Sequence, residues 1–225
     1  MVQVHTAHSV QAMMNAAGYP VSDAQRDMLS AYASLLLEWN GVVNLISRKD
    51  EGQLWRNHIL HALAALLTVD LPREGRMLDL GTGGGLPGIP LAILLPQVEF
   101  TLVDSIAKKT RAVSDIADRL GLRNVTVHRG RAEDAALLQT CGKRMDVVLA
   151  RAVTQLPALV RWSFPLLRAQ GLRRLIVWKG GALEAEIAEA RRHPKVHAIS
   201  EDALHVPDEP WYEREEKKII EVEFR

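Results

Sequence analysis

The chain has 225 residues, of which 48% are hydrophobic and 24% are charged, and its formal net charge is +1. This length suits one α/β domain with a small extension, and the composition excludes an intrinsically disordered chain. The near-neutral charge gives no global electrostatic case for nucleic-acid binding, so any such surface has to be a local patch.

Three features set the expected cellular location. The first 20 residues lack a basic segment followed by an apolar core, so no secretory signal is expected. The longest apolar runs, 62–67 and 89–95, are far too short to span a bilayer. Cys141 is the one cysteine, which excludes an internal disulfide and a thiolate metal cluster. We therefore expect a soluble, cytoplasmic monomer with no membrane partner.

Residues 1–72 are expected to form a helical extension packed on the main domain. Residues 1–20 carry little periodic pattern. Ser22 and Gln25 form a capping box, which predicts a helix that runs to about Trp39 and buries one apolar stripe. A second helix is predicted to follow after a turn, over residues 51–67, and then a proline and a glycine break the pattern.

Residues 73–225 have the rhythm of an α/β domain. Short apolar runs alternate with amphipathic segments, which is typical of a parallel sheet with helices on both faces. The predicted helices cover residues 86–95, 107–121, 131–139, 156–168 and 182–191. The last two strand-like segments, 196–206 and 217–224, have a loop with proline and tryptophan between them and no predicted helix. They are expected to form an antiparallel pair at the sheet edge.

A glycine-rich stretch, LDLGTGGGLPGIP, follows the first strand of the predicted sheet at residues 78–90. It does not suit a triphosphate, because no Lys-Ser or Lys-Thr pair follows the glycines. A dinucleotide fingerprint fits Gly83, Gly85 and Gly88 by spacing. That match is poor, because the third glycine would lie inside a helix start beside Pro87, which suits the first helical position.

The other interpretation of this stretch is a D-x-G-x-G-x-G pattern with Asp79, Gly81, Gly83 and Gly85. Alternate glycines let the backbone approach a ligand closely. Asp104 ends the next strand, where its carboxylate can accept both hydroxyls of a ribose. The pattern favours S-adenosylmethionine, which has no pyrophosphate, and leaves an NAD-dependent dehydrogenase as the alternative.

Several segments together resemble one known family. They are LLLEWNGVVNLIS (35–47), NHILHAL (57–63), LDLGTGGGLPGIPLAILLP (78–96), FTLVDSIAKKTRAV (100–113), GRAEDA (130–135) and VVLARAVTQLPALVRW (147–162). The chain resembles the bacterial 16S rRNA guanine-N7 methyltransferases, called RsmG or glucose-inhibited division protein B (GidB). The resemblance implies a Rossmann-like, seven-stranded class I methyltransferase sheet with an N-terminal helical extension.

The resemblance also implies an activity and a set of cofactor contacts. The expected reaction moves a methyl group from S-adenosylmethionine to N7 of a guanine in 16S ribosomal RNA, free or in a 30S particle. The implied cofactor contacts are Gly81 and Leu86 in the glycine loop, Ala132 and Glu133 after the third strand, and Arg151 after the fourth. Asp104 matches the ribose-binding acid of class I methyltransferases.

Arg151 is the catalytic candidate, because it ends an apolar strand at the edge where α/β sheets bind ligands. Guanine N7 carries a free lone pair, so the enzyme mainly has to align the reactants and exclude water. Arg151 is expected to contact the guanine at O6, the cofactor carboxylate, or both in turn. A donor on N7 itself would occupy the attacking lone pair.

Other methyltransferase chemistries fit the sequence less well. Methylation of a pyrimidine carbon needs a cysteine near the end of the fourth strand, and Cys141 precedes that strand. Exocyclic amino methyltransferases carry an Asp/Asn-Pro-Pro-aromatic motif where this chain has LARAV. A class I methyltransferase with another substrate and a non-catalytic RNA-binding module stay open as alternatives.

Basic residues near strand ends are the candidates for RNA contact. Arg129, Arg131 and Lys179 are expected to face the substrate. Further basic candidates are Lys108, Lys109, Arg111 and Arg123. His58 and His61 lie one helical turn apart, but no third ligand is evident, so we expect packing contacts and no metal site. Helical spacing places Trp39 and Trp55 in the core.

Overall fold

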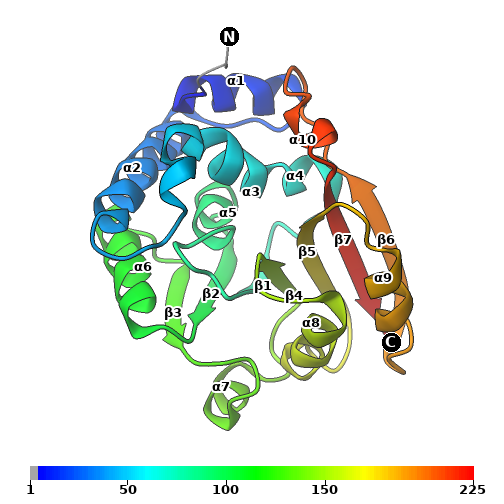
Figure 1. Cartoon of the computed structure of the whole chain (residues 1–225). Coiled ribbons are helices and arrows are strands. Elements are labelled where there is room, and N and C mark those ends of the chain that lie inside the picture. Colours follow the sequence, from blue (N-terminus) through cyan, green and yellow to red (C-terminus); the bar gives the residue numbers. More distant parts are fainter. Residues whose placement is uncertain (1–4) are drawn as a thin grey trace.

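The computed structural model describes residues 5–225, and its centre is a mixed sheet with the order β3-β2-β1-β4-β5-β7-β6 (Figure 1). Its strands are β1 (Gly75–Leu80), β2 (Val98–Asp104), β3 (Val125–Arg129), β4 (Val147–Arg151), β5 (Arg174–Gly180), β6 (Val196–Ala203) and β7 (Lys217–Phe224). β1 to β5 pair in parallel, whereas β7 is antiparallel to both β5 and β6. The predicted seven-stranded, mostly parallel sheet and its antiparallel edge pair are confirmed.

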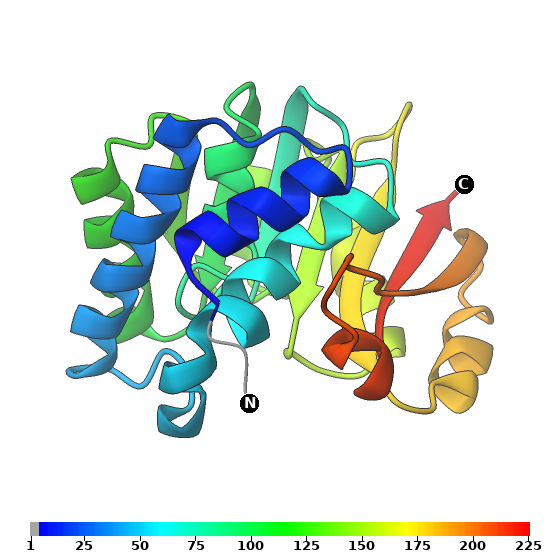
Figure 2. The same cartoon turned by 90° about the horizontal axis from the view of Figure 1, so that it is seen from above.

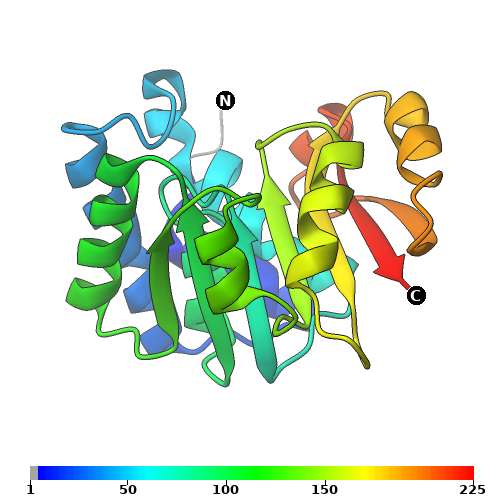
Figure 3. The same cartoon turned by 90° about the horizontal axis from the view of Figure 1, so that it is seen from below.

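Helices cover both faces of this sheet, as Figures 1 and 3 show. They are α5 (Gly88–Leu94), α6 (Ala107–Leu120), α7 (Ala135–Cys141), α8 (Leu156–Ser163) and α9 (Glu184–Ala190), and a short 3₁₀ turn, η3 (Phe164–Leu166), follows α8. Alternate strand residues enter two separate cores. Met77 packs with α5, α6 and the N-terminal helices, and Leu78 packs with α7, α8 and α9.

Two predictions for the sheet domain were wrong in detail. A four-residue helix, α10 (Trp211–Arg214), lies between β6 and β7, where no helix was predicted. It is too short to show a periodic pattern in the sequence. The helix predicted over 131–139 begins later, at Ala135, because the Asp134 side chain accepts a 2.7 Å bond from the Arg131 amide and closes a turn before it.

The N-terminal extension holds α1 (Ala7–Ala16) and α2 (Asp23–Asn40), which cross one face of the sheet domain (Figure 2). The capping box at the start of α2 is confirmed, because Ser22 and Gln25 exchange side-chain and backbone bonds. The second predicted helix is wrong as a continuous element. It is divided into η1 (Arg48–Gln53), η2 (Trp55–Leu60), α3 (His61–Leu63) and α4 (Ala65–Thr68), of which η1 is a 3₁₀ helix and η2 a π-helix.

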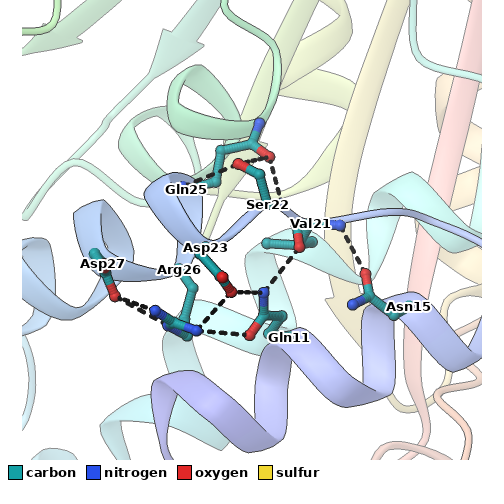
Figure 4. Close-up of polar contacts among 8 residues, drawn as sticks. All are labelled: Gln11, Asn15, Val21, Ser22, Asp23, Gln25, Arg26 and Asp27. Atoms are coloured by element: carbon teal, nitrogen blue, oxygen red, sulfur yellow. Dashed lines mark hydrogen bonds and ion pairs between the residues drawn. The ribbon is translucent and has the colours of Figure 1, made fainter.

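Helix α1 was missed, because little periodic pattern was recognised in residues 1–20. It begins with its own capping box, in which Thr6 and Ser9 exchange bonds. Figure 4 shows how its polar face is tied to α2. The Gln11 amide donates 3.0 Å bonds to the Val21 carbonyl and to Asp23, and the Asn15 side chain accepts a 2.7 Å bond from the Val21 amide. These contacts fix α1 against the start of α2.

The extension and the sheet domain share one apolar core. Leu36 of α2 would lie 2.7 Å from a Cβ placed on Gly84, so only glycine lets this helix approach the glycine loop. The Tyr32 hydroxyl donates a 3.0 Å bond to the Gly84 carbonyl from a fully buried position. Within residues 5–225, no helix combines the length and the apolar character that a membrane span requires.

Candidate active site

The glycine loop after β1 has the backbone conformation that its sequence predicts. Gly81, Gly83 and Gly85 all have left-handed φ angles, of 74°, 59° and 89°. Side chains rarely adopt such angles, so the alternate glycines are required by the turn itself. The amides of Gly81 and Thr82 donate bonds of 2.8 Å and 2.9 Å to the Val103 carbonyl, which ties the loop to the end of β2.

Asp79 is completely buried beneath this loop. Its Oδ2 atom accepts a 2.6 Å bond from the Thr82 hydroxyl and a 3.0 Å bond from the Gly88 amide. Burial raises the pKa of Asp79 to about 6, and the two bonds and the charge of Arg151 oppose that rise. The carboxylate therefore fastens the loop to the start of α5, and its predicted contact with a cofactor stays a prediction.

Gly88 is the first residue of α5 and the point of closest packing there. A Cβ at this position would lie 2.2 Å from the Leu102 side chain and 2.9 Å from the Asp79 carboxylate. Pro87 precedes the helix at the cap position, so its prediction as the first helical residue was off by one. Leu86 is buried in the core and does not line the adjacent cavity.

A cavity of about 430 Å³ opens at the carboxyl ends of β1, β2 and β4. Asp104 lines it, and its side chain accepts bonds of 3.1 Å from the Gly83 amide and 2.9 Å from the Ile106 amide. Both bonds fix the carboxylate at the cavity wall. Gly81 forms the neighbouring wall, where a Cβ would lie 2.6 Å from Val153.

The opposite wall comes from the segment after β3. Ala132 is buried, whereas Glu133 and Arg131 are exposed at the rim. The structure thus brings together four predicted cofactor contacts, namely Gly81, Asp104, Ala132 and Glu133. This volume is typical of a site for a small organic ligand.

Sequence reasoning missed several residues of this cavity. The apolar side chains of Ile106, Val153 and Trp162 line it, with exposed fractions of 48% and 37% for the first two. Ala152 adopts a left-handed φ of 55°, which turns the chain at the end of β4. Ile106 could have been found by its place two residues after Asp104, whereas the position of Trp162 depends on how α8 packs.

Arg151, the catalytic candidate, does not line this cavity, because its side chain faces the N-terminal extension. Its guanidinium group donates a 2.9 Å bond to His58 Nδ1, and it lies 3.4 Å from His61 Nδ1 and 3.3 Å from the Asn57 carbonyl. Because a guanidinium can only donate, His58 accepts this bond through Nδ1, which places the proton of its neutral ring on Nε2. The extension therefore holds the end of β4 through one arginine.

The two histidines are kept neutral by their surroundings. Burial, followed by the charge of Arg151, lowers the pKa of His58 to about 4 and moves the pKa of His61 in the same direction. No group of three or more histidine, cysteine or acidic side chains in residues 5–225 could hold a metal ion. The expected packing contacts of these histidines are confirmed, but their partner Arg151 was not foreseen.

The predicted RNA-binding residues have different environments. Arg129 and Arg131 are exposed, and neither forms an ion pair within residues 5–225. Lys179 is largely buried and donates bonds of 2.8 Å to Glu186 and 3.0 Å to the Thr154 carbonyl. The carboxylate of Glu186 in α9 neutralises the charge of Lys179, so Lys179 is less suited to phosphate binding than the two arginines.

The remaining candidates from the sequence have structural positions. Cys141 is buried at the end of α7, and burial raises the pKa of its thiol, which opposes a nucleophilic role. Trp39 and Trp55 are half-buried and pack against the core. The Trp39 indole also donates a 2.7 Å bond to Asp115 of α6.

The chain is similar to proteins of one known family along most of its length. The family model described as rRNA small subunit methyltransferase G matches residues 25–215. A Bacteroides thetaiotaomicron protein named ribosomal RNA small subunit methyltransferase G is 38% identical over 186 residues, which cover 81% of this chain and 87% of that relative. A Chlorobium luteolum protein of the same name is 42% identical over 183 residues, covering 81% and 74%.

Solved structures share the fold at low sequence identity. A predicted O-methyltransferase from Agrobacterium tumefaciens has a TM-score of 0.56 and 16% identity, over 73% of this chain and 80% of that one. Fibrillarin from Aeropyrum pernix, with natively bound S-adenosyl-L-methionine, has a TM-score of 0.52 and 15% identity, over 71% and 73%. These likenesses support the methyltransferase architecture of the sheet.

Proposed function

Since the chain belongs to the rRNA small subunit methyltransferase G family, we propose that it transfers a methyl group from S-adenosylmethionine to N7 of a guanine in 16S ribosomal RNA. The observation that carries the proposal is the cavity beside the glycine loop, with Asp104 fixed in its wall. Family membership also favours S-adenosylmethionine over the dinucleotide alternative.

The lining of the cavity fits this cofactor in size and in chemistry. Asp104 would accept the ribose hydroxyls, and Ile106, Val153 and Ala132 offer apolar surface for the adenine ring. Glu133 and the Ala132 amide lie at the wall where they would meet the adenine edge. Gly81 forms part of the cavity wall through its backbone alone, which would let the main chain approach the methionine end.

The proposed chemistry asks the protein for alignment and desolvation. S-Adenosylmethionine supplies an electrophilic methyl group on a sulfonium. The guanine N7 lone pair is already available at neutral pH, so no side chain has to remove a proton first. The histidines nearest to Arg151 are neutral and directed at its guanidinium, which agrees with a site that lacks a general base.

We propose Arg151 as the residue that orients the guanine through O6 or the cofactor through its carboxylate. Its bonds to His58 and to the Asn57 carbonyl would hold it near the end of β4 until a ligand arrives. Replacing Arg151 with alanine should lower S-adenosylhomocysteine affinity, single-turnover methylation, or both. If neither quantity changes, this role is wrong.

The direct test of the proposed function uses labelled S-adenosylmethionine with two substrates, free 16S rRNA and 30S particles. We expect methyl transfer to at least one of them, and cleavage at 7-methylguanine maps the position. Methylation at a position other than guanine N7 would support a class I methyltransferase with another target. RNA binding without transfer to either substrate would support the non-catalytic alternative.

A thermal-shift comparison tests the cofactor separately. S-Adenosylhomocysteine at 100 times its dissociation constant should stabilise the folded chain by about 2.7 kcal/mol, because a ligand that binds only the folded state shifts the unfolding equilibrium. NAD at the same concentration should leave the melting temperature unchanged. Stabilisation by NAD alone would overturn the cofactor assignment.

A further inference from the structure

A second cavity, of about 610 Å³, lies beside the cofactor cavity. It is formed by residues 40–42 and 44–48, between α2 and η1, and by Lys109 of α6. Lys109 also lines the first cavity, so the two hollows meet at this one side chain. We call the second one the α2–α6 groove.

The wall of the α2–α6 groove is held in a fixed shape. The buried Asn40 side chain accepts bonds of 2.8 Å and 2.9 Å from the Leu45 and Ile46 amides, and donates a 2.7 Å bond to Glu51. Leu45 packs onto the glycine loop, since its side chain would lie 3.2 Å from a Cβ on Gly84. The groove is therefore braced against the loop of the cofactor cavity.

The charge of the groove is positive. Its lining holds two cationic side chains, Arg48 and Lys109, and no carboxylate. Two acids that follow the lining segment in sequence have hydrogen-bond partners, because Glu51 accepts the Asn40 amide and Asp50 accepts a 2.8 Å bond from Asn57. Two polar residues, Asn44 and Ser47, complete the wall.

More basic side chains lie along the same elements. Lys49 follows Arg48, and Lys108 and Arg111 lie in the first part of α6. All three are exposed, and none of the five basic side chains forms an ion pair with another residue of 5–225. By contrast, Lys179 is neutralised by Glu186. These five basic side chains therefore form a group of cations, unpaired within residues 5–225, in and beside the groove.

We propose that the α2–α6 groove binds the phosphate backbone of the substrate RNA next to the nucleotide that is methylated. The proposal rests on the function proposed above and names the surface that receives its substrate. Arg48 contacts phosphate within the groove, and Lys109 does so where the groove meets the cofactor cavity. Phosphate contacts of this kind position a nucleic acid without reading its sequence.

The test compares Arg48→Glu with Arg192→Glu. Arg192 is an exposed arginine that follows α9, at the other end of the sheet from α6 (Figure 1), and it forms no ion pair within residues 5–225. Both variants change the net charge by the same amount. Arg48 does not line the cofactor cavity, so S-adenosylhomocysteine affinity and the melting temperature should stay at the values of the unmodified protein in both.

Affinity for a 16S rRNA transcript is measured by filter binding at several salt concentrations with S-adenosylhomocysteine present. We expect Arg48→Glu to weaken binding about tenfold and to reduce the salt slope by about 1, whereas Arg192→Glu matches the unmodified protein. Lys109→Glu should weaken RNA binding similarly. Equal affinity for Arg48→Glu and Arg192→Glu, or no RNA binding by the unmodified protein, would overturn the proposal.

The failure of this proposal can be told apart from the failure of the proposed function. If the unmodified protein methylates RNA and Arg48→Glu binds RNA normally, the groove assignment alone is wrong. If the unmodified protein binds RNA through Arg48 but methylates no RNA, the groove assignment holds and the enzymatic function is wrong.

Discussion

Asp79 and Asp104 lie near the ends of two neighbouring parallel strands, but their surroundings differ. Asp79 has no exposed surface, and one of its carboxylate oxygens accepts bonds from the Thr82 hydroxyl and the Gly88 amide. Asp104 lines the cavity, and its carboxylate accepts bonds from the backbone amides of Gly83 and Ile106. One acid is used to build the loop, and the other is positioned toward the space that the loop encloses.

The same division runs along the whole carboxyl edge of the sheet. On the β4 side, the N-terminal extension contacts Arg151 through His58, and Glu186 pairs with Lys179. On the β2 and β3 side, the cavity is open and rimmed by exposed charges such as Arg131. The charged side chains on the β4 side thus have protein partners, whereas Arg131 at the cavity rim forms no ion pair within residues 5–225.

The largest effect is expected for Gly88→Ala, which tests the close packing around the buried Asp79. The new methyl group would overlap Leu102 and press on Asp79, with distances of 2.2 Å and 2.9 Å in the unrelaxed structure. We expect the free energy of unfolding to fall by about 3 kcal/mol, as for other overpacked sites. Urea denaturation measures it.

Gly52→Ala is the matched control, because a Cβ there meets no atom within 4 Å. It should change the free energy of unfolding by less than about 0.5 kcal/mol. If both variants lose the same free energy of unfolding, the close packing around Gly88 is not the cause of the loss.

Asp104→Ala tests the carboxylate that lines the cofactor cavity. We expect S-adenosylhomocysteine affinity to fall about 30- to 100-fold, because two charge-assisted hydrogen bonds to the ribose would be lost. Asp118→Ala removes an exposed acid from α6 and should leave affinity unchanged. Isothermal titration calorimetry measures both variants, and unaltered affinity in Asp104→Ala would remove the carboxylate from the cofactor site.

The buried titratable groups at the carboxyl edge of the sheet should also make the free energy of unfolding depend on pH. The pKa of His58 falls from 6.5 unfolded to about 4 folded, so its contribution is complete above pH 6.5 and is lost as the pH falls toward 4. Asp79 has the opposite sign, because its pKa is raised to about 6 and its contribution is lost as the pH rises from about 4 to 6. His61 acts in the same direction as His58, so we expect a net loss of stability on acidification.

His58→Gln should reduce that loss by about 2 kcal/mol between pH 7 and pH 4, because one buried group no longer has to gain a proton. Glutamine can still accept from Arg151. His197→Gln, at an exposed position on β6, should keep the original dependence. Urea midpoints at the two pH values measure the change, and the same slope in both variants would refute this role of His58.

The alternation of strands and helices could be predicted because each element buries one face with a clear period. The capping box at Ser22 and Gln25 and the glycine pattern after β1 were also local enough to be recognised. Helix α10 and the broken segment 48–68 were not, because their conformations depend on contacts such as the Tyr212 hydroxyl with the Arg56 carbonyl.

The candidate site divides in the same way. Gly81 and Asp104 could be placed in the cavity from their positions at strand ends, and the structure puts them there. Trp162 enters only because α8 packs against β5. The environment of Arg151 depends on His58, which is 93 residues away in sequence, so no local pattern could give it.

The smallest effect is expected at the contact that joins the extension to the glycine loop. Tyr32→Phe removes the hydroxyl that donates a 3.0 Å bond to the Gly84 carbonyl and leaves that buried acceptor without this partner. We expect the free energy of unfolding to fall by about 1 kcal/mol. Ser34→Ala removes an exposed hydroxyl from the same helix, and it should cost almost nothing. If Tyr32→Phe also weakens S-adenosylhomocysteine binding while Ser34→Ala does not, the N-terminal extension helps to set the shape of the cofactor cavity through Gly84. If both variants keep full affinity, the extension stabilises the glycine loop without shaping the cavity.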